Sequence, residues 1–449
     1  MRIQTIVAVA LCLSLLGCPA VEDSPGVGPS TSAAKSAGSR DGATESRPAG
    51  EPRPPADDRE KEAIEKIGES GARVDRDEAG HALLVDFSTA TIGDDDLVHL
   101  RALPYLERLV LPSPEVGDAG MEHVGQLKSL QRLQLDQTVV SDEGLEKLAG
   151  LTNLIVLQLR KTLVEGTGFP HLASMTNLRE LDVRFNNLTN ESLAPLAKLP
   201  RLSNLKLQGC SLLDDGCLEH VVKIPSIERL NLASVAVTDD GLKQLAHLDL
   251  KGLELDDTQF VTDEGMKTIG RMKNLDTLTF MGNFIRDEGL AEIAGHKKMR
   301  RLRLRSTAVS DDGLAHLKGM IALENLDLSE SGIGDEGLAH LSGLTNLRDL
   351  NLWSVFIGDA GLAHLANLGE LRNLNLDQTL ITDAGLDSLA GLSKLESLNL
   401  SRTAITDAGL AKLHGLKNLK QLHVANVTDI TPTGIAALKK AIEGVEVRR

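Results

Sequence analysis

The sequence is poor in aromatic residues, which make up 2% of its 449 residues and include a single Trp and a single Tyr. Hydrophobic residues nevertheless make up 41%, so a core can form, but it must be built from aliphatic side chains. Sugar-binding sites usually stack their ligand on several aromatic rings. The shortage of aromatic rings therefore argues against, without excluding, a carbohydrate ligand.

Basic residues are outnumbered, with 48 Lys and Arg against 64 Asp and Glu, for a formal charge of −16. Such a surface repels phosphate backbones, so we expect no nucleic-acid binding. Common catalytic patterns are also absent: there is no GxSxG, no HExxH, no P-loop and no GxGxxG opening a helix. We therefore predict a protein that is not an enzyme, with no cofactor and no small-molecule substrate.

The only long apolar run lies at the front of the chain. Arg2 precedes "IVAVALCLSLL" (residues 6–16), which is too short to span a bilayer comfortably, and "LLGC" follows at residues 15–18. This segment resembles the signal peptide and lipobox of bacterial lipoproteins, whereas the alternative is an ordinary secretory signal with an incidental cysteine. The resemblance implies that residues 1–18 form a lipoprotein signal, that Cys18 is acylated, and that the lipid anchors the protein in the cell envelope, either periplasmic or surface-exposed.

Residues 19–56 are rich in Pro, Gly, Ser and Ala and have almost nothing to bury. This composition predicts a disordered stalk, whose ends would lie roughly 35 Å apart. Residues 57–81 predict a helix followed by a strand or hairpin that caps the remaining domain, residues 82–449. The last residues, "TGIAALKKAIEGVEVRR", predict a closing helix and strand at the other end.

From about residue 82 the sequence repeats itself, with about fifteen units. Leucines recur every 24 residues at 106, 130, 154, 178 and 202, and after small slips near 227, 250 and 275 the period resumes from Met299 to Leu419. A fixed period of this length indicates a solenoid.

One unit, "LQRLQLDQTVVSDEGLEKLAGLTN" (residues 130–153), begins with alternating leucines and continues with Leu145, Leu148 and Leu151 at helical spacing. This pattern resembles the leucine-rich repeats of bacterial envelope proteins over about 370 residues. The resemblance implies an α/β solenoid, a horseshoe with a parallel β-sheet on its concave face and short helices on its convex face. "LKLQGCSLLDDGCLEHV" (205–221) resembles the cysteine-containing repeats of F-box proteins, but no F-box is apparent.

An aspartate recurs just before each helical segment. Such a side chain can accept hydrogen bonds from the free N–H groups of the first helical turn, although the preceding Thr or Ser offers an alternative cap. A calcium ladder would need several oxygen ligands around one ion, and no second acidic column keeps the period, so we predict no metal site. The predicted structural helix caps are Asp142, Asp287, Asp311, Asp335, Asp359, Asp383 and Asp407.

Histidines and cysteines leave similar alternatives. His316, His340 and His364 share one helical position and could bind zinc, but they lack matching Cys or Asp partners. Cys210 and Cys217 could form a disulfide in an oxidising compartment, although we expect two buried free thiols.

Function must then come from the outward side chains of the strands. One unit presents three arginines, and two units later stands Trp353, which we expect to face solvent roughly 10 Å from Arg305. Trp and Arg dominate protein interfaces, although these residues could merely keep the sheet soluble. The predicted partner-binding residues are Arg301, Arg303, Arg305, Asp327, Asp349, Asn351, Trp353 and Asp377.

These features predict a protein-recognition scaffold, lipid-anchored in the bacterial envelope, that binds partner proteins through its concave surface. The alternative function is binding of glycans or peptidoglycan. A second, weaker basic cluster on the concave face contains Arg160, Lys161, Arg184, Phe185 and Lys206.

Overall fold

The computed structural model describes residues 53–449. Cys18, the signal peptide and residues 19–52 of the predicted stalk lie outside the described residues. The compact unit begins at Pro54, slightly before the predicted boundary at residue 57. The reason is that two residues assigned to the stalk bond to the cap: the Pro54 carbonyl lies 2.7 Å from Nε2 of His81, and the N–H of Ala56 donates to the Ala79 carbonyl.

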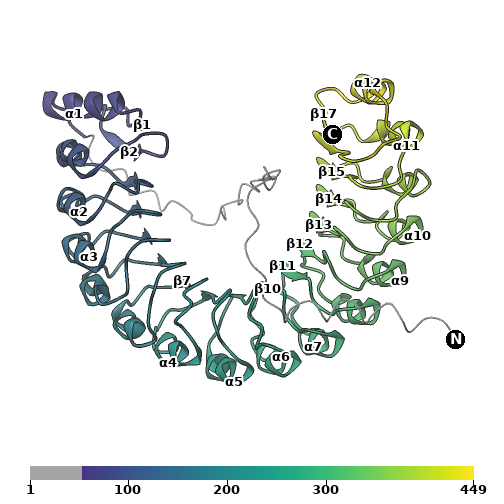
Figure 1. Ribbon diagram of the computed structural model, residues 1–449, viewed down its shortest axis with the longest axis horizontal. Helices are drawn as coiled ribbons and strands as arrows, with labels where there is room; N and C mark the ends of the chain where they lie inside the picture. Colours follow the sequence, from purple (N-terminus) through teal and green to yellow (C-terminus); the bar gives the residue numbers. More distant parts are fainter. Residues whose placement is uncertain (1–52) are drawn as a thin grey trace, which may run out of the picture. The chain divides into compact units, whose positions relative to one another are not determined.

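Within this unit one sheet of 17 strands runs from end to end, and each strand pairs with the next in the sequence (Figure 1). The first pair is antiparallel and the following pairs are parallel. The strands are β1 (Arg73–Arg76), β2 (Ala82–Asp86), β3 (Arg108–Val110), β4 (Arg132–Gln134), β5 (Val156–Gln158), β6 (Glu180–Asp182), β7 (Asn204–Lys206), β8 (Arg229–Asn231), β9 (Gly252–Glu254), β10 (Thr277–Met281), β11 (Arg301–Arg305), β12 (Asn325–Asp327), β13 (Asp349–Asn351), β14 (Asn373–Asn375), β15 (Ser397–Asn399), β16 (Gln421–His423) and β17 (Glu446–Arg448).

Short helices follow the strands and form the outer, convex layer of the unit, while the strands line its concave side (Figure 1). The α-helices are α1 (Asp58–Glu69), α2 (Asp118–Val124), α3 (Asp142–Leu148), α4 (Leu218–Val221), α5 (Asp239–Leu242), α6 (Asp263–Ile269), α7 (Asp287–Glu292), α8 (Asp311–Leu314), α9 (Asp335–Leu338), α10 (Asp359–Ala363), α11 (Asp407–Lys412) and α12 (Pro432–Ala441). The 3-10 helices are η1 (Asp94–Ala102), η2 (Phe169–Ser174), η3 (Glu191–Lys198), η4 (Asp215–Cys217), η5 (Lys243–His247), η6 (Ala315–Leu317), η7 (Ala339–Leu341), η8 (Gly385–Leu389) and η9 (Leu413–Gly415).

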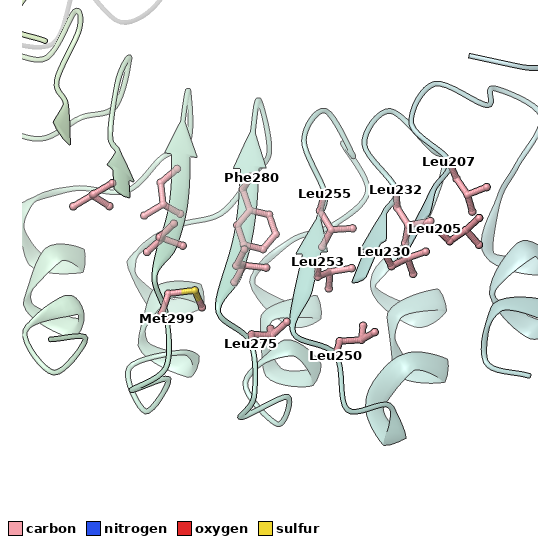
Figure 2. Close-up of a cluster of buried hydrophobic side chains, with 14 of the residues drawn as sticks. Leu205, Leu207, Leu230, Leu232, Leu250, Leu253, Leu255, Leu275, Phe280 and Met299 are labelled. Atoms are coloured by element: carbon pink, nitrogen blue, oxygen red, sulfur yellow. The ribbon is translucent and has the colours of Figure 1, made fainter. Parts of the chain in front are cut away.

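The core is a continuous aliphatic column between the sheet and the helices (Figure 2). The parallel register places Leu302, Leu326, Leu350 and Leu374 side by side, and all four are buried. Burying one leucine contributes about 1.5–3 kcal/mol, but a single coil would leave both flanks of its leucines in water. Stability therefore comes from stacking neighbouring coils.

A tight turn ends each strand and sends the chain from the concave side toward the helices. From the coil of β4 to that of β16, one residue per coil has a positive φ there, and most are not glycine, for example Gln137 (63°) and Ser354 (56°). The hydroxyl of Thr138 donates to the Leu135 carbonyl at 2.8 Å and closes this turn. Such φ values cost a non-glycine residue some free energy, which the stacking on both sides of the turn must offset.

The two ends are capped as the sequence predicts. At the first end α1 buries Ala63, Ile64 and Ile67 against the core, and β1 pairs with β2. His81 and Glu60 are both buried, 2.6 Å apart. Burial lowers the pKa of His81, but the Glu60 carboxylate and the Pro54 carbonyl more than compensate, so that the net shift is upward. At the other end α12 and β17 close the sheet.

The repeated aspartates join neighbouring coils, which differs from the predicted capping of their own helices. Asp142 is the first residue of α3, and the cap of that helix is Ser141, whose hydroxyl accepts from the N–H of Glu143 at 3.2 Å. The carboxylate of Asp142 instead accepts three backbone N–H groups of the next coil, those of residues 165, 166 and 168. The same bond to the next coil forms where the preceding residue makes no side-chain cap, as at Gly334 before Asp335, so the carboxylate reaches the neighbouring coil whether or not its own helix is capped.

Other coils show the same arrangement in a regular form. Asp383 accepts the backbone N–H of Thr406 on Oδ1 at 2.8 Å and the hydroxyl of Thr406 on Oδ2 at 2.6 Å. The carboxylate thus holds the residue that precedes the next helix. Equivalent bonds to the next coil are made by Asp287, Asp311, Asp335, Asp359 and Asp407.

The glycine of the next helix makes room for each aspartate. A Cβ added to Gly337 would lie 2.3 Å from Oδ1 and 3.1 Å from Cα of Asp311, and Gly361 and Gly409 stand in the same relation to Asp335 and Asp383. This glycine therefore allows neighbouring coils to stack closely. The aspartate of one coil and the glycine of the next form a matched pair.

We expect Gly337→Ala to lower the free energy of unfolding by about 1–3 kcal/mol, because the added methyl group would overlap the Asp311 carboxylate. In an Asp311→Ala background the same substitution should cost less, since the group that it meets is gone. Urea denaturation of the four proteins measures this coupling. Gly343→Ala is the control, because no atom lies within 4 Å of the added Cβ there. If Gly337→Ala and Gly343→Ala lowered the free energy of unfolding equally, the pairing of Gly337 with Asp311 would be contradicted.

Candidate functional site

The eight residues predicted to bind a partner lie on or directly after four adjacent strands, β11 to β14, and we call them the concave patch. In the sheet Arg301 pairs with Asn325 and then Asp349, while Arg303 pairs with Asp327 and then Asn351. Their side chains alternate with buried leucines and therefore face the concave side. The structure thus brings the predicted residues together, while their binding role stays a prediction.

Arg303 is engaged in ion pairs. Its Nη1 lies 2.8 Å from Oδ2 of Asp256, at the end of β9, so the side chain crosses β10. Its Nε lies 3.9 Å from Oδ2 of Asp327 on the neighbouring strand. Asp256 is 7% exposed. Burial raises the pKa of the Asp256 carboxyl, and the charge of Arg303 partly opposes that rise.

Arg305 and Trp353 are in direct contact, and their separation is shorter than the expected 10 Å. The guanidinium carbon lies 4.9 Å from the ring centroid. The arginine side chain reaches across β12 over the small, buried Ser329, while its Nε donates to Oε2 of Glu330 at 2.8 Å. A contact of this kind is worth about 0.5–2 kcal/mol. Trp353 is half-buried rather than fully solvent-facing.

The acidic members of the patch are also bonded. Asp327 accepts the hydroxyl of Ser329 at 2.6 Å, and Asp377 binds Arg402 through both carboxylate oxygens, at 2.8 and 2.7 Å. Asp349 accepts the side-chain amides of Asn325 and Asn373. Asn351 accepts the backbone N–H of Trp353 at 3.2 Å.

Arg301 differs from these residues. Its side chain is exposed, and within residues 53–449 it has no ion-pair partner. Within residues 53–449 the concave patch therefore holds two charged side chains without an ion-pair partner, Arg301 and Asp349, and of the two only Arg301 also lacks a side-chain hydrogen bond.

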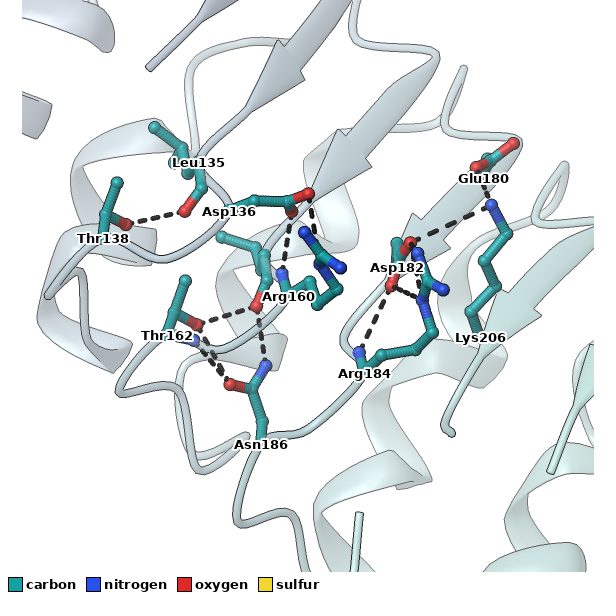
Figure 3. Close-up of polar contacts among 11 residues, drawn as sticks. Leu135, Asp136, Thr138, Arg160, Thr162, Glu180, Asp182, Arg184, Asn186 and Lys206 are labelled. Carbon is teal, nitrogen blue, oxygen red and sulfur yellow. Dashed lines mark hydrogen bonds and ion pairs between the residues drawn. The ribbon is translucent and has the colours of Figure 1, made fainter. Parts of the chain in front are cut away.

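The second basic cluster is neutralised in the same way (Figure 3). Arg184 donates to both oxygens of Asp182, and Lys206 lies 2.6 Å from the Glu180 carboxylate. Arg160 lies 3.5 Å from Asp136. The strong positive potential that this cluster of residues suggests in the sequence is thus largely cancelled by its neighbours.

Within residues 53–449 the histidines and cysteines form neither a metal site nor a disulfide. His316 and His340 are half-exposed and His364 is exposed on the convex helices, and within residues 53–449 no three His, Cys, Asp or Glu side chains are grouped to hold a metal ion. Cys210 and Cys217 are buried and unbridged. Burial raises the pKa of their thiols to about 11 and about 12, so both stay protonated at neutral pH.

None of the helices in residues 53–449 is long and apolar enough to span a membrane.

The ion-pair partners of the patch, Asp256, Glu330 and Arg402, were not predicted from the sequence. A signal was present, because the paired charges lie about one or two repeat periods apart. A second example is Arg229, which reaches Asp276 at 2.7 Å by passing the small residue Gly252. Gly252 lies on the intervening strand β9, and its lack of a side chain leaves room for the Arg229 side chain.

We expect Arg303→Met to lower the free energy of unfolding at neutral pH by about 1–3 kcal/mol, since Arg303 itself is partly exposed. Losing Arg303 should raise the pKa of Asp256 further. A carboxyl group whose pKa is higher in the folded state lowers the free energy of unfolding at any pH above its unfolded-state pKa. This loss disappears as the pH falls through the two pKa values.

The deficit of the Arg303→Met variant should therefore shrink toward acid pH in a series of urea denaturation curves. Arg301→Met, which removes an unpaired charge from the same strand, is the control and should change stability little. A deficit of Arg303→Met that does not depend on pH would argue against the Asp256 pair.

Comparisons with known proteins agree with this architecture. Residues 369–430 match a model described as a leucine rich repeat, and residues 126–149, 174–197 and 322–342 match a second model of that description. Curated proteins give no match. Among solved structures, an internalin of Listeria monocytogenes is similar with a TM-score of 0.54 and 23% identity, over 72% of this chain and 87% of that chain. Internalin C2 of the same organism has a TM-score of 0.34 and 24% identity, over 53% of this chain and 84% of that chain. The chain folds as an α/β solenoid of leucine-rich repeats.

Proposed function

We propose that this protein is a recognition scaffold, held in the bacterial cell envelope by a lipid on Cys18, and that it binds a partner protein through the concave patch. The proposal rests chiefly on one observation: the patch is a surface of bonded polar side chains, from which the exposed Arg301 side chain projects without a hydrogen bond or ion pair to residues 53–449.

The ion pairs support this reading because they fix side chains before a partner arrives. Arg303 and Arg305 are each held by a carboxylate at 2.8 Å, and the Trp353 ring lies beneath Arg305. Long side chains that are already ordered lose less entropy on binding, which favours affinity. A patch whose charges are paired internally also avoids burying several uncompensated ions at an interface.

The chemistry of the patch indicates the kind of partner. An acidic group placed opposite Arg301 would compensate its charge, and a small apolar surface would fit beside the Trp353 ring. We therefore expect a protein with an acidic, partly apolar contact surface.

The anchoring part of the proposal rests on sequence. Arg2, the apolar run of residues 6–16 and the "LLGC" box favour acylation of Cys18, and the residues up to Pro54 would then separate the lipid from the folded unit.

To test the binding site, a photo-crosslinking amino acid is placed at position 301 or at position 132 of the full chain in its native cell. Arg132 is the matched control because it is exposed at the same repeat position on β4. We expect a crosslinked partner at position 301 and not at 132. Arg301→Glu should then weaken binding of the purified partner at least tenfold, whereas Arg132→Glu should leave it unchanged. The same adducts at both positions would exclude the patch.

To test the anchor, wild type and Cys18→Ser are compared by membrane fractionation and by labelling with a fatty-acid analogue. Wild type should carry the label and sediment with membranes, while Cys18→Ser should lose both properties. Cys12→Ser, which removes the other cysteine of the segment, is the control and should behave as wild type. Unlabelled wild type would leave an ordinary secretory signal as the explanation.

A further inference from the structure

Large apolar side chains are exposed at one recurring position of the coils, three residues before the aspartate that joins each coil to the next. Phe260, Phe284, Phe356 and Leu380 occupy this position and are 62%, 62%, 77% and 65% exposed. We call these four side chains the rim row. The same position carries the exposed Val139 and Leu212 farther toward the N-terminus. Isolated exposed apolar residues are ordinary, whereas residues that repeat at one position are brought near one another by the stacking of the coils.

Backbone contacts show that the members of the row are neighbours. The N–H of Leu380 donates to the Ile357 carbonyl, next to Phe356, at 2.9 Å. Phe284 forms a parallel bridge with Thr262, two residues after Phe260. Each pair therefore spans one strand spacing, about 4.8 Å. All four residues follow the ends of parallel strands, so they lie along the same edge of the sheet, outside the concave patch.

Two small exposed residues separate the pairs. Ala308 and Gly332 occupy the equivalent positions of the two coils in between, and the N–H of each donates to the coil before it. Phe260 and Phe284 form the first pair, and Phe356 and Leu380 form the second. The centres of the two pairs lie four coils apart, or about 20 Å. The row thus offers two apolar contacts with a gap between them.

Carboxylates flank this gap. Glu288, Asp312 and Glu336 each follow the coil-joining aspartate by one residue at the start of α7, α8 and α9, and all three are exposed. Within residues 53–449 none of the three has an ion-pair partner. Arg286, two residues before Glu288, is exposed and adds one positive charge, so these four side chains together carry an excess of two negative charges.

We infer that this edge binds a basic protein segment that carries apolar side chains at both ends. The apolar ends would cover the two pairs of the rim row, and the basic middle would face Glu288, Asp312 and Glu336. This site goes beyond the proposed function, because it uses another surface and selects a partner of the opposite charge.

Charge decides between this occupant and two others. A second copy of the chain, stacked edge to edge, would bring the same three carboxylates of both copies together, which costs free energy. An anionic lipid surface would meet the same repulsion. A basic segment gains from the carboxylates and from apolar burial at once.

The probe is a fluorescent peptide, LLKKKKLL, whose leucine pairs lie about 20 Å apart when extended. Its binding to the full chain is measured by anisotropy at several salt concentrations. We expect Phe260→Ser with Phe356→Ser to weaken binding at least tenfold. Glu288→Gln, Asp312→Gln and Glu336→Gln together should weaken it similarly and flatten its salt dependence. The peptide LLEEEELL should not bind.

Two matched controls locate the site. Val98→Ser with Ile321→Ser removes exposed apolar residues that lie outside the row, and Glu62→Gln, Glu65→Gln and Glu78→Gln remove three exposed carboxylates from the N-terminal cap. Both controls should bind the peptide as wild type does. Equal losses in test and control variants would overturn the proposal. The proposal would also be overturned if wild type dimerised or bound neutral lipid vesicles and the Phe260→Ser, Phe356→Ser protein did not.

Discussion

The structure depends on one constraint, the fixed spacing at which each coil stacks on the next. The sheet hydrogen bonds, the buried leucine columns and the carboxylates that reach the following coil must all fit this spacing. The clearest sign is Gly337, where even one methyl group would overlap Asp311 of the coil before. Because every coil has the same neighbours, any side chain is placed beside its equivalents, and surface chemistry arises as rows rather than as isolated sites.

The same regularity explains what the sequence could predict. The alternation around Leu350 and the helical spacing of Leu362 and Leu365 locate strand, helix and buried face in every coil, and the period fixes which coils touch. The concave columns follow directly, so the placing of Arg303 beside Asp327 was predictable. Both terminal caps were predictable too, since the pattern ends where an apolar flank needs cover.

Side-chain direction was not predictable to the same degree. An aspartate at the start of a helix can bond within its own first turn or across to the next coil, and both choices satisfy the same general preference for acidic groups there. Asp142, whose helix is capped by Ser141, bonds to the next coil, and so does Asp335, whose helix has no side-chain cap. The contact of Arg305 with Trp353 likewise depends on the small Ser329 between them, a detail of packing rather than of period.

The charges that remain uncompensated separate the two surfaces. On the concave patch most charged groups are paired, and Arg301 and Asp349 have no ion-pair partner within residues 53–449, whereas along the rim row Glu288, Asp312 and Glu336 form a negative excess. The two surfaces therefore differ in the charge that they offer a ligand. Because the two surfaces lie on different sides of the strand-end turn, occupation of one leaves the other open. A scaffold of this kind could hold an acidic and a basic partner together, with the stiffness of the stacked coils fixing the distance between them.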